Sequence, residues 1–162
     1  MTRFSNIIND VEKSIAPIGQ TPSGLFFLGG VVLKILIVGY DAELTLLTGK
    51  ILARSGYDIV CCSCMDEVLT LIARGDIGLV IAELESEEPE RVRFCRAVKE
   101  TQKPPKLLFI GRSGEEETVM LNAGADDWIK KPYKTAVFLA RVSALMRQCP
   151  HGYAAQKGEE WK

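Results

Sequence analysis

The chain has 162 residues, and its 20 Lys and Arg residues nearly balance 21 Asp and Glu residues, for a formal net charge of −1. This length suits one globular domain with short extensions, and the near-neutral charge offers no basic footprint for a nucleic acid. His151 is the single histidine, which argues against histidine-based triads and multi-histidine zinc sites.

The first 24 residues are predicted to form an amphipathic helix and a linker. An apolar stripe at helical spacing consists of Phe4, Ile7, Ile8, Val11 and Ile15. Pro and Gly residues then punctuate residues 17–24, which is typical of a linker. The helix could pack on the following domain as a cap, mediate dimerisation or partner binding, or be an artificial extension.

Residues 25–148 alternate between strand and helix patterns. The predicted strands are 31–38, 57–62, 79–84, 106–110 and 128–130, and the predicted helices are 42–55, 66–74, 89–101, 115–123 and 135–148. Apolar strands joined to helices by short loops predict an α/β fold, a parallel sheet with helices on both faces. Residues 149–162 are predicted to form a polar C-terminal tail.

The cysteines and the apolar segments bear on the cellular compartment. The five cysteines are an odd number, and Cys61, Cys62 and Cys64 lie too close together for a disulfide framework. They also lack a second cysteine pair or a histidine at zinc-ligand spacing. We find no secretory signal at the N-terminus, and the apolar run 25–38 is too short and interrupted to span a membrane. We therefore expect a cytoplasmic protein.

In a parallel sheet, functional groups gather at the carboxyl ends of the strands, here residues 39–41, 83–86, 110–113 and 130–133. Near the last of these, residues 122–133 read Asn-Ala-Gly-Ala-Asp-Asp-Trp-Ile-Lys-Lys-Pro-Tyr. This run resembles a signature of the receiver domains of bacterial two-component response regulators. Residues 34–38, 56–58 and 140–147 resemble the same family.

The resemblance implies a flavodoxin-like sheet of five parallel strands. It also implies phosphorylation of an Asp at the end of the third strand, beside Mg²⁺ held by acidic residues after the first strand. A Ser or Thr after the fourth strand and a Lys after the fifth contact the phosphoryl group in that family. The Lys corresponds to Lys131, and the bond to Pro132 is expected to be cis, as in the family.

The other chemical positions depart from the family pattern. Gly39 and Tyr40 stand where the family has acidic residues, and Asp41 comes one position too late. Glu83 replaces the acceptor Asp, and Ile110 replaces the Ser or Thr. Because misplacement of a reacting carboxylate by about 1 Å can cost roughly 10²-fold in rate, we expect no phosphoryl transfer. A single displaced carboxylate cannot replace a pair in holding Mg²⁺, so we also expect no bound metal and no cofactor.

Two interactions are expected in this degenerate pocket. Glu83 could pair with Lys131, either as a structural salt bridge or as a lock that holds an active-like conformation; the third alternative is no contact at all. The ring of Tyr40 is expected to fill the space of the missing metal as packing.

The sequence therefore predicts a phosphorylation-independent receiver, or pseudo-receiver, which is not an enzyme and acts as a protein-interaction module in bacterial signalling. Its predicted partner surface is the face of 115–123, 128–130 and 135–148, or the N-terminal helix, either of which could form a homodimer. The predicted contact residues are Trp128 as an exposed anchor, with Lys130, Tyr133, Arg141 and Arg147. Two alternatives are a small-ligand or nucleotide binder that uses the vacated pocket, and a phospho-accepting receiver with a displaced acceptor.

Overall fold

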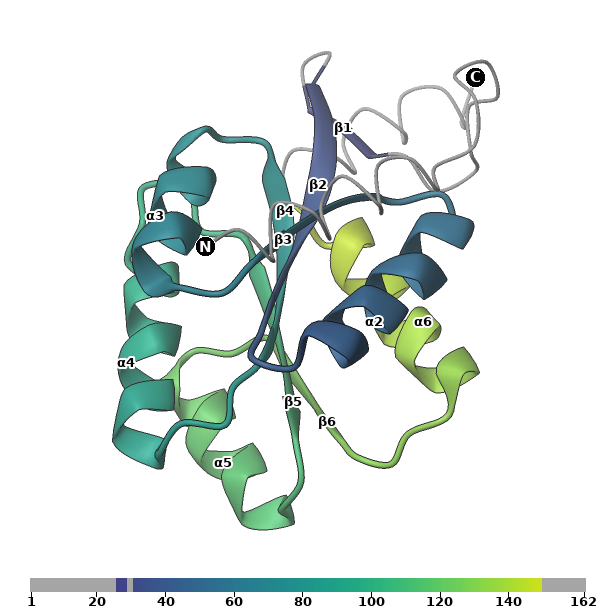
Figure 1. Cartoon of the computed structure of the whole chain (residues 1–162). Helices are drawn as coiled ribbons and strands as arrows, with labels where there is room; N and C mark the ends of the chain where they lie inside the picture. The colour runs from purple at the N-terminus through teal and green to yellow at the C-terminus, as the bar shows by residue number, and fades with distance from the viewer. Residues whose placement is uncertain (1–25, 29–30, 150–162) are drawn as a thin grey trace.

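The computed structural model describes residues 26–28 and 31–149 (Figure 1). The strands are β1 (Phe26–Leu28), β2 (Val31–Gly39), β3 (Asp58–Cys62), β4 (Ile77–Glu83), β5 (Lys106–Gly111) and β6 (Asp127–Lys130). The helices are α2 (Ala42–Arg54), α3 (Met65–Ala73), α4 (Glu88–Lys99), α5 (Gly114–Ala123) and α6 (Thr135–Arg147). Within these ranges every predicted helix and strand is present, with ends displaced by at most two residues.

The parallel sheet has the strand order β3–β2–β4–β5–β6. This is the flavodoxin-like order, so the predicted fold class is confirmed. The prediction lacked strand β1, which pairs antiparallel with the start of β2, from Phe26 opposite Leu33 to Leu28 opposite Val31. The sequence does carry a signal for this hairpin, because Gly29-Gly30 separates the two strands by two residues.

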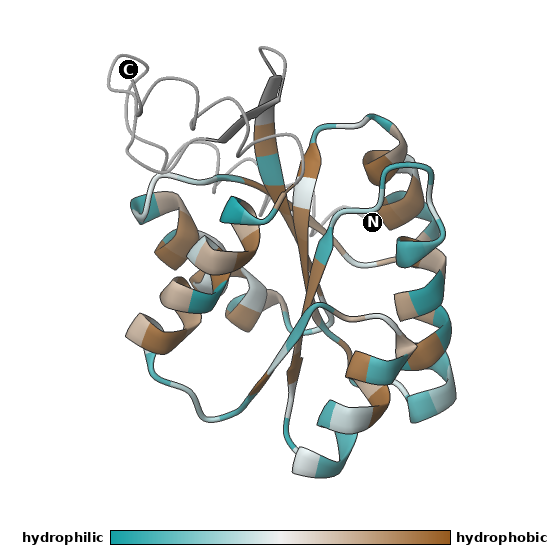
Figure 2. Ribbon diagram, turned by 180° about the vertical axis from the view of Figure 1, so that it is seen from behind, coloured by the Kyte–Doolittle hydropathy of each residue, from teal (hydrophilic) through white to brown (hydrophobic). Residues whose placement is uncertain are grey.

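The sheet divides the hydrophobic core into two layers, because successive side chains of a strand point to opposite faces. Helices α2 and α6 cover one face and contribute Leu52 and Phe138 to it. Helices α3, α4 and α5 cover the other face, where Phe94 packs edge-on against Phe109 of β5 with ring centroids 5.9 Å apart. Figures 1 and 2 show this arrangement, with hydrophobic strands between two helical layers.

The family-like run at residues 122–133 has a structural basis. Gly124 ends α5 with φ of +118°, a left-handed conformation that favours glycine. The Asp126 carboxylate accepts hydrogen bonds from the backbone N–H of Leu107 and from Lys99 Nζ, both at 2.8 Å. This residue therefore joins the start of β5 to α4 and the turn before β6. The Lys131–Pro132 peptide bond is cis, as the resemblance implies.

The domain extends one residue further toward the C-terminus than predicted. Cys149, which was assigned to the polar tail, is buried, and its thiol donates to the backbone carbonyl of Gly78 at 3.3 Å. It therefore belongs to the domain, because it fills the space between the end of α6 and β4. The predicted N-terminal helix and linker, 1–24, and the remaining tail, 150–162, lie outside the described residues. No helix in the described ranges is long and apolar enough to cross a membrane.

Candidate functional site

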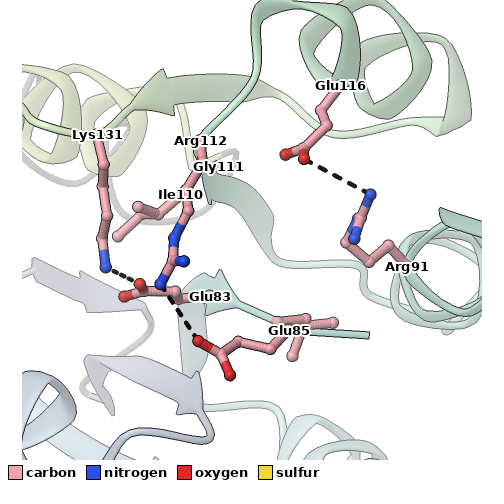
Figure 3. A pocket seen from close by; sticks show the side chains of 9 residues that line it. Glu83, Glu85, Arg91, Ile110, Gly111, Arg112, Glu116 and Lys131 are labelled. Atoms are coloured by element: carbon pink, nitrogen blue, oxygen red, sulfur yellow. Dashed lines mark hydrogen bonds and ion pairs between the residues drawn. The ribbon is translucent and has the colours of Figure 1, made fainter. Parts of the chain in front are cut away.

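The carboxyl ends of β2, β4, β5 and β6 meet at one edge of the sheet. Gly39 pairs with Glu83 across β2 and β4, and Gly111 pairs with Lys130 across β5 and β6. The parallel register therefore places Gly39, Glu83, Ile110 and Lys131 of the predicted pocket at the same edge. Figure 3 shows Glu83, Ile110 and Lys131 around a common hollow.

At Gly39, the end of β2, an acidic side chain would collide with a neighbouring helix. A Cβ atom on Gly39 would lie 2.7 Å from Oγ1 of Thr45, which is buried in α2. Asp41 is the N-cap of α2, and its Oδ1 accepts from the N–H groups of Glu43 and Leu44 at 2.9 and 3.2 Å. The expectation that Tyr40 fills the pocket is wrong. Its side chain is 58% exposed, because the chain turns outward to begin α2.

Glu83 and Lys131 form an ion pair, each with its side chain mostly buried. Partial burial lowers the pKa of Lys131, and the nearby Asp41 carboxylate opposes this shift. Ile110 is buried in the core layer beside α6 and offers no hydroxyl group. The Lys side chain thus has a carboxylate partner within its own domain.

A pocket of about 350 Å³ lies beside this pair. Sequence reasoning missed both arginines that line it, Arg91 from the first turn of α4 and Arg112 after β5. Arg112 pairs with Glu85 at 3.3 Å, and Arg91 lies 3.8 Å from Glu116 of α5 (Figure 3). Arg112 stands in one of the strand-end segments, so its position was a usable signal. No sequence pattern marks Arg91, because its distance to the pocket depends on how α4 packs.

The donor set does not fit a magnesium ion. Mg²⁺ needs several oxygen ligands in near-octahedral geometry, whereas Asp41 caps a helix and Glu83 neutralises Lys131. Across the described ranges, no group of three or more His, Cys, Asp or Glu side chains is placed to hold a metal.

Trp128 is the clearest correction to the predicted site. Its side chain is only 5% exposed and packs in the core layer under α3, α4 and α5. The prediction took Trp128 as an exposed anchor, but Trp128 and Ile129 are both buried, one in each core layer on the two faces of β6. Gly111 makes room for the indole, since a Cβ there would lie 2.7 Å from Trp128 Nε1.

The other predicted contact residues divide into packed and exposed side chains. Tyr133 is half-buried and stacks on Phe138 with ring centroids 5.2 Å apart. Burial raises the pKa of Tyr133, and a side-chain hydrogen bond with Thr48 partly offsets this. Lys130, Arg141 and Arg147 are exposed. Arg141 donates to the Asp127 carboxylate at 2.9 and 3.0 Å, and Arg147 donates to the Ser143 hydroxyl at 2.9 Å.

The cysteines give a test of the packing around this domain. All five are free, and four are buried, Cys64 being the exposed one. Burial raises the pKa of Cys61, Cys95 and Cys149 to about 11. Because the thiolate is the reactive form, we expect Ellman's reagent at mildly alkaline pH to modify only Cys64 rapidly in the folded protein.

In denaturant all five thiols should react at similar rates. A Cys64→Ser variant is the matched control, and the folded form should then lack a fast phase. A second fast thiol in the native protein would contradict the buried positions of these side chains.

Comparison with known proteins supports the resemblance. No model of a protein family matches the chain. The transcriptional regulatory protein YxdJ of Bacillus subtilis is 28% identical over 128 residues, covering 78% of this chain and 56% of that protein. The transcriptional regulatory protein CpxR of Escherichia coli is 28% identical over 116 residues, covering 71% of this chain and 50% of that protein. The chain thus spans about half the length of these curated relatives.

Solved structures share the fold. A two-component response regulator from Clostridium difficile superposes with a TM-score of 0.64 at 20% identity, covering 73% of this chain and 98% of the other. An orphan response regulator of H. pylori superposes with a TM-score of 0.61 at 23% identity, covering 71% of this chain and 97% of the other. NtrX from Brucella abortus in complex with ADP superposes with a TM-score of 0.65 at 18% identity, covering 76% of this chain and 28% of the other.

Proposed function

We propose that this chain, whose described residues form a response-regulator receiver domain, acts as a protein-interaction module in two-component-type signalling without being phosphorylated. The observation that carries the proposal is the Glu83–Lys131 ion pair. In the phosphorylated receivers that the chain resembles, the corresponding Lys meets the phosphoryl group. Here the carboxylate of Glu83, at the end of β4, neutralises it.

Three further features support the proposal. A side chain at Gly39 is excluded by Thr45, so an acidic residue cannot stand there without rearrangement. Asp41 is engaged as a helix cap, and Ile110 is part of the core. Each of these features removes a group that phosphorylation would need, so we expect the domain to act through binding to a partner.

The proposed partner surface, named here the α5–β6–α6 face, needs new anchors because Trp128 is buried. Leu121 on α5 and Val137 on α6 are 39% and 43% exposed, and Lys130 lies on β6 between these helices. Apolar anchors among Lys and Arg side chains are typical of interface centres with polar rims. The partner is a signalling protein or a second copy of the chain.

The phosphorylation test uses a small phosphodonor. We expect acetyl phosphate with Mg²⁺ to leave the intact mass of the protein unchanged, because the described residues place Glu83 at the acceptor position and hold no group of three metal ligands. Intact-mass spectrometry before and after incubation makes the measurement.

The matched control is Glu83→Ala, which removes the carboxylate at the acceptor position and leaves Lys131 in place. A phosphoryl adduct on the unmodified chain that disappears in Glu83→Ala would overturn the proposal. It would also establish the displaced-acceptor alternative.

A further inference from the structure

The pocket beside Glu83 is lined by an arginine, Arg91, whose N–H groups outnumber the hydrogen-bond acceptors around them. The side chain of Arg91 is only 16% exposed. Its Nη1 donates to the backbone carbonyl of Ser86. Its Nε is fully buried and has no hydrogen-bond partner among the described residues. Because a guanidinium group carries five N–H donors and is costly to bury unsatisfied, this position calls for additional acceptor oxygens.

The carboxylates around the pocket do not meet this need. Glu116 lies 3.8 Å from Arg91 Nη2, which exceeds the length of an N–H···O hydrogen bond. Arg112 and Glu85 are both largely exposed, so solvent screens their attraction and the pair separates easily. Arg112 can therefore turn toward an incoming anion, while Arg91 stays in place against the Ser86 carbonyl and Glu83 continues to hold Lys131.

We propose that this pocket binds a small phosphate-bearing anion, with Arg91 at its inner wall and Arg112 closing over it. Arginine matches a phosphate group well, since its planar fork donates two parallel hydrogen bonds to adjacent oxygens. The pocket volume of about 350 Å³ lies at the lower end of the range for small-molecule sites. Its lining holds three cations, Arg91, Arg112 and Lys131, and three carboxylates, Glu83, Glu85 and Glu116, so an anion binds by displacing the weak contacts of Glu85 and Glu116. Anion binding here goes beyond the proposed function, and the proposed function does not depend on it.

The test is calorimetric titration of the full chain with inorganic phosphate and with glycerol 2-phosphate, against sodium chloride at matched ionic strength. We expect saturable binding of at least one phosphate compound in roughly the millimolar range or tighter, and none of chloride. Tighter binding of glycerol 2-phosphate would identify an organic phosphate as the natural class. Tighter binding of inorganic phosphate would identify the free ion. Absence of saturable binding by either compound would overturn the proposal.

Variants locate the site. Arg91→Gln should weaken binding about tenfold or more, as expected for loss of a charged hydrogen-bond donor. Arg112→Gln changes an exposed side chain, leaves the fold intact and should weaken binding too, which keeps the proposal testable if Arg91→Gln unfolds. The matched control is Arg74→Gln, at the exposed end of α3 away from the pocket. Unchanged affinity in Arg112→Gln, or an equal loss in Arg74→Gln, would contradict the site.

Discussion

Replacement of Trp128 by alanine is expected to destabilise the domain by about 3–5 kcal/mol, the usual cost of truncating a large buried aromatic side chain. The indole is 5% exposed and packs with Phe94 and Phe109 in one core layer. A domain of this size has about 5–15 kcal/mol of total stability, so the loss is a large share of it. Urea unfolding followed by far-ultraviolet circular dichroism measures the change.

Val137→Ala is the control for this experiment, because it shortens an exposed side chain and should change stability by no more than about 0.5 kcal/mol. If Trp128→Ala unfolds at the same urea concentration as the unmodified protein, the indole does not pack in the core. The result also matters for function, since partner binding lost in Trp128→Ala would reflect unfolding and not a lost contact.

The second large effect is expected on the α5–β6–α6 face. Leu121→Asp and Val137→Asp each place a charge at an exposed apolar position, so folding should be retained. Binding should weaken by at least about 30-fold for a substitution at an interface hot spot, equivalent to 2 kcal/mol or more. Sedimentation velocity measures self-association, and quantitative mass spectrometry of proteins that co-purify with the tagged chain measures binding to other partners.

Leu47→Asp is the matched control, because Leu47 is also an exposed apolar residue, at 55%, but lies on α2. Deletion of residues 1–24 tests the competing surface on the predicted N-terminal helix. If the deletion abolishes association while Val137→Asp and Leu121→Asp leave it intact, the helical stripe of Phe4, Ile7 and Ile8 carries the interaction.

Sequence periodicity predicts the fold well because each central strand is a continuous apolar run bounded by turn residues. Glycines 56, 75 and 124, which end predicted helices, all have positive φ in the structure, so local chemistry and fold agree there. The register then brings Gly39 opposite Glu83 without further information. Strand β1 was not predicted because its three residues give too little periodicity, which leaves Gly29-Gly30 as the one signal for the hairpin.

The site could be predicted only in part, because side-chain burial depends on what covers each strand. Trp128 reads as an exposed anchor when β6 is taken alone, and only the positions of α5 and α6 show that both of its faces are covered. Arg91 had no signal, since it approaches the strand ends from a helix. Glu83 and Lys131 were predictable as neighbours because parallel strands end at the same edge of a sheet.

The capping role of Asp41 has an evolutionary consequence. A lineage that regained metal binding by moving this carboxylate toward the strand ends would lose the N-cap of α2, at a cost of about 1 kcal/mol. Gly39 offers no easier route, because a Cβ there would lie 2.7 Å from Oγ1 of Thr45, so that buried side chain has to shift. Tyr40 is exposed, but a single acidic residue there would not supply a pair of carboxylates. A metal site built from these three positions therefore needs several substitutions at once, each of which disturbs the start of α2 or adds only one carboxylate.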